Sequence, residues 1–137
     1  MIAVSSFPEH LAGLRVLVVE DTPMVARETL CCLADLGCRP IGPAATVADA
    51  EEALAGHRVD AAVVDLNLRG ESAEPFLRTL AARGVPAVVA SSDDRAVERL
   101  AGAGAATLLK PFLAQDLGRA MQAAIEQGRG RARDAAA

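Results

Sequence analysis

Residues 16–25 read VLVVEDTPMV, a run of aliphatic side chains that ends on two adjacent acids, Glu20 and Asp21. The β-branched and aliphatic residues at 15–19 are typical of a short buried strand. Either acid alone would be an ordinary turn residue or helix cap. Two carboxylates directly after a buried strand are also what a binding site at the end of that strand would require, and the other segments decide between these interpretations.

A helix is predicted directly after this strand, over residues 22–36. Thr22 can cap its first turn, Pro23 suits that turn because no N–H is needed there, and Gly37 can end it. Further strands are predicted at 38–42, 59–64, 86–90 and 106–109, and further helices at 46–55, 73–83, 94–102 and 113–126. Five strands alternating with five helices predict a doubly wound α/β domain, in which helices cover both faces of one parallel sheet.

The length and charge of the chain limit what it can be. Its 137 residues suit one domain, predicted over 15–127, with an N-terminal extension at 1–14 and a disordered tail at 128–137. The 14 basic and 18 acidic residues give a net charge of −4, which disfavours binding to nucleic acid or to an anionic membrane. Because no apolar run is long enough to cross a bilayer, the protein is expected to be cytoplasmic.

Polar side chains follow four of the five predicted strands. In a parallel sheet these strand ends meet at one edge, which is where such folds bind ligands. The residues brought to that edge are Glu20 and Asp21 after the first strand, Asp65 after the third, Ser91 and Ser92 after the fourth, and Lys110 with Pro111 after the fifth. The sequence therefore predicts that three carboxylates, hydroxyl groups and one ammonium meet at this edge.

Three carboxylates in a small volume repel one another unless a cation neutralises them. A site with oxygen ligands only favours a hard ion such as Mg²⁺, which keeps open positions for phosphate oxygens. A carboxylate beside a metal and a lysine can act as a covalent nucleophile toward phosphorus. Asp65, at the end of the predicted central strand, is the best candidate nucleophile, and Glu20 and Asp21 then hold the metal.

Four segments, VLVVEDTP, VVDLNLRGE, PAVVASSDD and TLLKPF, resemble the signature segments of two-component response regulator receiver domains, and the resemblance runs over 15–127. It implies a flavodoxin-like fold with strand order 2-1-3-4-5. It also implies that Asp65 accepts a phosphoryl group from a phosphohistidine, and that Lys110, before a cis bond to Pro111, pairs with that group. Mg²⁺ would be bound by Glu20, Asp21, Asp65 and the backbone carbonyl of Asn67, and Ser91 would be the switch hydroxyl.

Further features of the sequence bear on the switch and on the lifetime of the phosphate. Receivers usually have an aromatic residue three positions before the lysine, where this chain has Thr107, so aromatic coupling is not expected. The loop after the third strand and PAVVASSDD resemble a receiver subgroup associated with alphaproteobacterial kinases, in which the switch need not use that aromatic. Asn67 and Asp93 lie two positions after the phosphoacceptor and the switch hydroxyl, where polar side chains could orient a water and speed loss of the phosphate.

Two functions compete. The first is a stand-alone receiver, not an enzyme, whose partners are a histidine kinase or histidine phosphotransferase and a downstream protein target, with homodimerisation left open. The second is a small metal-dependent phosphohydrolase that also forms an aspartyl phosphate. Such hydrolases usually place a second acid two residues after the nucleophile as general acid and base, and this chain has Asn67 there.

Overall fold

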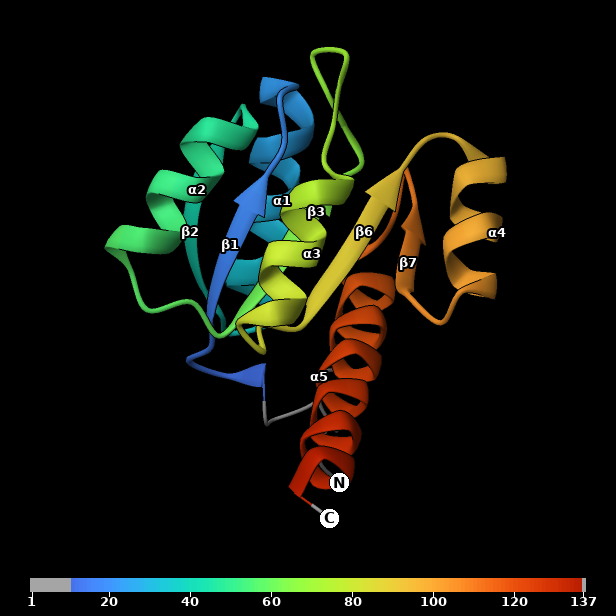
Figure 1. Ribbon diagram of the computed structural model, residues 1–137. Coiled ribbons are helices and arrows are strands. Elements are labelled where there is room, and N and C mark those ends of the chain that lie inside the picture. The colour runs from blue at the N-terminus through green and yellow to red at the C-terminus, as the bar shows by residue number, and fades with distance from the viewer. Residues whose placement is uncertain (1–10, 137) are drawn as a thin grey trace, which may run out of the picture.

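The computed structural model describes residues 11–136, with side chains described through residue 130 (Figure 1). Its main sheet has five parallel strands in the order β2-β1-β3-β6-β7. The strands are β1 (Arg15–Val19), β2 (Arg39–Ala44), β3 (Ala61–Asp65), β6 (Ala87–Ser91) and β7 (Ala106–Leu109). Counted along the chain, this is the predicted order 2-1-3-4-5, so the predicted fold class is confirmed.

Helices cover both faces of the sheet (Figure 1). They are α1 (Pro23–Asp35), α2 (Val47–Gly56), α3 (Glu74–Ala82), α4 (Asp94–Gly102) and α5 (Ala114–Ala136). Successive strand residues point to opposite faces. Val16 and Val18 of β1 accordingly pack in the core under α1 and α5, whereas Leu17 and Val19 pack in the core under α2 and α3.

The central strands are buried on both faces, which explains their continuous apolar sequences. All five residues of β3 are buried, and so are the last four residues of β1. A buried strand can include polar side chains only where these find hydrogen-bond partners. The carboxylates that follow β1 and end β3 therefore mark the rim of the core, where the site lies.

The two predicted ends of the domain differ from the structure. The last helix is predicted over 113–126, but α5 continues through Ala136, so the tail predicted to be disordered is helical over 128–136. Its alanines and arginines are good helix formers, and they outweigh the two glycines. At the other end Leu11 is fully buried in the core, so the predicted extension overlaps the domain; residues 1–10 lie outside the described part of the chain.

A short hairpin was not predicted at all. β4 (Asn67–Leu68) pairs antiparallel with β5 (Glu71–Ser72) and forms a second, two-stranded sheet directly after Asp65. Arg69 and Gly70 connect the two strands, both with positive φ. None of the helices in the described residues is long and apolar enough to cross a membrane.

Candidate functional site

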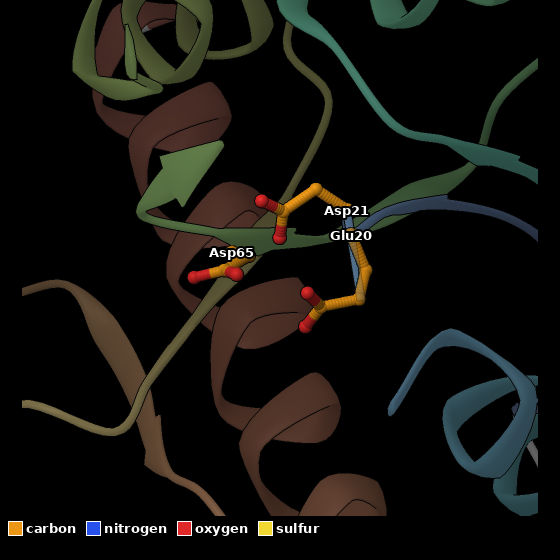
Figure 2. Close-up of side chains that lie close together, drawn as sticks. All are labelled: Glu20, Asp21 and Asp65. Atoms are coloured by element: carbon orange, nitrogen blue, oxygen red, sulfur yellow. The ribbon is translucent and has the colours of Figure 1, made fainter. Parts of the chain in front are cut away.

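The three predicted acids come together at the carboxyl ends of β1 and β3 (Figure 2). These strands are neighbours, and Val19 pairs with Val64, so Glu20 and Asp65 follow side by side. One carboxylate oxygen from each of Glu20, Asp21 and Asp65 lies within 4.8 Å of the others. Glu20 and Asp65 are buried, with 5% and 8% of their surface exposed, whereas Asp21 is half-buried.

Lys110 supplies the positive charge at this cluster. Its ammonium Nζ donates to Glu20 Oε1 at 2.8 Å and to Asp65 Oδ2 at 3.2 Å. Burial on its own lowers the pKa of Lys110, but the hydrogen bond to Glu20 and the charge of Asp65 outweigh it and hold that pKa above its ordinary value. The lysine is therefore charged at neutral pH and connects two strands of the site.

The two acids after β1 have different surroundings. Burial raises the pKa of Glu20 above its ordinary value, against the hydrogen bond from Lys110. Partial burial also acts to raise the pKa of Asp21, but hydrogen bonds, chiefly from the backbone N–H of Arg69 at 2.8 Å, hold that pKa below its ordinary value. Asp21 is thus ionised and fixed in place by a main-chain donor.

Ser91, the predicted switch residue, is buried at the end of β6. Its Oγ accepts a hydrogen bond from the backbone N–H of Asp93 at 3.0 Å, and its carbonyl accepts one from the N–H of Lys110 at 2.8 Å. The bond between Lys110 and Pro111 is cis, as the resemblance implied. Ser92 is exposed and lies with Lys110 and Pro111 on the wall of a cavity of about 350 Å³ beside the site.

The predicted water-orienting residues make other contacts. Asn67 is exposed, and its Oδ1 accepts from the N–H of Gly70 at 3.0 Å, which closes the turn of the hairpin. Asp93 caps α4, since its Oδ1 accepts from the N–H groups of Arg95 at 3.0 Å and Ala96 at 3.4 Å. These oxygens bind backbone N–H groups, and the orientation of a water by the two side chains stays a prediction.

Thr107 lies half-buried in β7, opposite Val89 of β6. A residue that sequence reasoning missed is Arg69, whose backbone N–H binds Asp21. Its side chain carries no signal for this, because any residue other than proline has such an N–H group. The only sequence indication of the hairpin was the Arg-Gly pair that lies between Asn67–Leu68 and Glu71–Ser72.

The donor set fits a hard divalent cation. Three carboxylates converge without a histidine or cysteine among them, and such oxygen sites suit Mg²⁺. Asp65 offers one oxygen to Lys110 while the other accepts from the N–H of Asn67 at 3.3 Å. With a cation and an ammonium beside it, this carboxylate is placed to bond to an electrophile such as phosphorus.

Comparisons with known proteins agree with this fold. The solved structure of SdrG from Sphingomonas melonis has 32% sequence identity and a TM-score of 0.72, over 89% of this chain and 99% of that one. A sensor protein from a Polaromonas species has 28% identity and a TM-score of 0.72, over 84% and 98% of the two chains. The anti-anti-sigma factor PhyR from Bartonella quintana, at 19% identity and a TM-score of 0.75, shares the fold over 52% of its length.

The comparison with curated proteins gave no match. The family model of the response regulator receiver domain, however, matches residues 16–122. That range contains the acids after β1, the acid that ends β3, the hydroxyl at the end of β6 and the lysine after β7. The chain therefore belongs to the response regulator receiver domain family, whose members act in two-component signal transduction.

Proposed function

We propose that this protein accepts a phosphoryl group onto Asp65 from a phosphohistidine of a histidine kinase or histidine phosphotransferase, in a reaction that requires Mg²⁺. One observation carries the proposal. Asp65 ends the central strand with one oxygen 3.2 Å from the ammonium of Lys110, and it shares a space of less than 5 Å with the carboxylates of Glu20 and Asp21. Asp65 would thus act as a nucleophile between the ammonium of Lys110 and two further carboxylates that could bind a metal ion.

The chemistry would begin when an Asp65 carboxylate oxygen attacks phosphorus. The bond between phosphorus and the donor histidine nitrogen breaks, and that nitrogen keeps the electron pair. Glu20, Asp21, Asp65 and the backbone carbonyl of Asn67 would hold Mg²⁺, which supplies positive charge next to the phosphoryl oxygens. Lys110, already within hydrogen-bonding distance of Asp65, would stabilise the same oxygens.

The signal would leave the site through Ser91. Its hydroxyl oxygen accepts from the N–H of Asp93, and its hydrogen could be donated to a phosphoryl oxygen on Asp65, which would draw the serine toward that group. Because Asp93 also caps α4, a change in this contact alters the start of that helix. A half-buried Thr107 replaces the usual aromatic, so the switch would depend on the Ser91–Asp93 contact.

We place the protein among cytoplasmic signalling modules that act through contacts with a downstream protein, not among enzymes with a substrate of their own. The position two residues after Asp65 supports this, because the Asn67 amide cannot act as general acid and base. The acidic net charge of −4 gives no support to binding of nucleic acid or of an anionic membrane. The homodimer stays an alternative arrangement for the active form.

Incubation with a small phosphodonor, such as acetyl phosphate, tests the proposal. In the presence of Mg²⁺ the intact mass should rise by one phosphoryl group, and Asp65→Asn or removal of Mg²⁺ by a chelator should abolish the rise. Asp60→Asn is the matched control, since Asp60 lies just before the opposite end of the same strand and accepts from the N–H of Arg15. Labelling that survives in Asp65→Asn would refute the assignment.

A further inference from the structure

The hairpin after Asp65 contains an unusual backbone conformation. Arg69 has φ 52°, and it is the only residue other than glycine with a positive φ among residues 11–136. Gly70 follows with φ 85°. Left-handed backbone is unfavourable for an arginine because of its Cβ, so this conformation persists only where the surroundings impose it.

The rest of the hairpin imposes it. Leu68 is 2% exposed and packs in the same core cluster as Ala73 and Phe76. The N–H of Ala73 donates to the carbonyl of Leu66 at 2.8 Å, which closes the base of the loop. The hairpin is therefore anchored at its base and, through the side chain of Asn67, across its turn.

The strained residue makes one contact outside the hairpin. The N–H of Arg69 donates to Asp21 Oδ2 at 2.8 Å, 48 positions away in the sequence. Asp21 forms none of the ion pairs found in the described residues, unlike Glu20 and Asp65, which both pair with Lys110. Without the hydrogen bond from Arg69, no ion pair would keep this half-buried carboxylate from turning toward solvent.

We infer that the hairpin Asn67–Ser72 is a positioning element for the metal site, and that Arg69 acts in it through its backbone N–H. The inference rests on the proposed Mg²⁺ site. One oxygen of Asp21 is bound by the hairpin, which turns the carboxylate toward Glu20 and Asp65 (Figure 2). Fixing a ligand before the cation arrives removes the cost of ordering it on binding, and so raises affinity.

Gly70→Ala tests this inference. An added Cβ would meet no atom within 4 Å, so the substitution strains the turn at φ 85° without a clash. We expect the dissociation constant for Mg²⁺, measured by titration calorimetry on the whole chain, to rise about fivefold. Gly84→Ala is the matched control: Gly84 has φ 71° and equally open surroundings, but it precedes β6 at the end of the sheet away from the site.

The two variants should lose similar stability to urea, but only Gly70→Ala should lose affinity for Mg²⁺. Equal affinity in Gly70→Ala and the unmodified chain would overturn the inference while leaving the metal site intact. Failure of the unmodified chain to bind Mg²⁺, or full affinity in Asp21→Asn, would instead overturn the metal site and the inference with it. A second readout is hydrogen exchange at the Arg69 amide, which should be at least tenfold faster in Asp21→Ala; an unchanged rate would overturn the inference.

Discussion

Lys110 bonds two buried carboxylates at once, and the exposed fractions of the three side chains are 14% for Lys110, 5% for Glu20 and 11% for Asp65. At such burial, the removal of one partner leaves charge without compensation. The ammonium therefore has a structural role as well as a chemical one. It lets two acids share a small volume before any phosphoryl group arrives.

Lys110→Met should consequently lower the free energy of unfolding by about 3 kcal/mol in a chelator, because the remaining acids repel each other without the ammonium. Added Mg²⁺ should restore part of this lost stability. The variant should also bind Mg²⁺ with a lower dissociation constant, because the ammonium no longer competes for the carboxylates. Urea unfolding with EDTA and with Mg²⁺ measures both effects. Arg58→Met is the control, as this arginine is exposed and its ion pair to Asp60 spans 3.7 Å. A Lys110→Met variant as stable in EDTA as this control would contradict the expectation.

A second residue whose identity is required is Gly42 in edge strand β2. Its φ is 105°, and a Cβ there would lie 2.8 Å from the carbonyl oxygen of Val18. We expect Gly42→Ala to lower the free energy of unfolding by at least about 2 kcal/mol, through strain and a backbone clash together. Gly56→Ala, at the last residue of α2 with open surroundings, should be neutral or slightly stabilising. Denaturant unfolding of both variants measures the difference, and equal effects would contradict it.

Among the elements, α4 is the least anchored helix. None of the nine residues of α4 is buried. A cavity of about 720 Å³ is lined by Leu100 of α4 on one side and by Leu77 of α3 on the other. One ion pair bridges the two helices, with Arg99 2.8 Å from Glu74, but Arg99 is largely exposed and Glu74 only half-buried, and such pairs contribute little. The stability of α4 therefore depends heavily on its N-cap, Asp93.

Asp93→Ala should remove two hydrogen bonds from the start of α4 and destabilise that helix by about 1 kcal/mol. Because α4 is held by few buried contacts, the loss should appear as local opening. Amide hydrogen exchange should accelerate in α4 more than in α5. Asp94→Ala is the control, since Asp94 is the first helical residue and not the cap. Equal acceleration in the two variants would show that the cap does not limit the opening of α4.

At the scale of the whole molecule, the sequence predicted what depends on repeating patterns. The five strands and the meeting of Glu20, Asp65 and Lys110 follow from apolar runs that end on polar residues, whereas the strand order was implied by the resemblance to receiver domains. The hairpin after Asp65 could not be predicted, because its turn holds an arginine at φ 52° against the ordinary preference of that residue. The helical end of α5 was not predicted because residues 128–137 are small and charged and show no apolar periodicity, whereas the alanines and arginines among them favour a helix.

The described fold also extends beyond the 16–122 range matched by the family model, at both ends but with different consequences. Leu11 is fully buried, and its carbonyl accepts from Cys38 Sγ at 3.3 Å, whereas the residues of α5 that join the core, among the side chains described through residue 130, lie at Ile125 and before. Leu11→Ala should therefore lower the free energy of unfolding by about 3 kcal/mol. A chain that ends at Gln127 should differ from the full chain by less than about 0.5 kcal/mol, because it keeps every described side chain of α5 that packs in the core. Urea unfolding of Leu11→Ala and of the truncated chain compares the two losses in stability. If the truncation costs more than Leu11→Ala, the last turns of α5 stabilise the domain and its core does not end at Ile125.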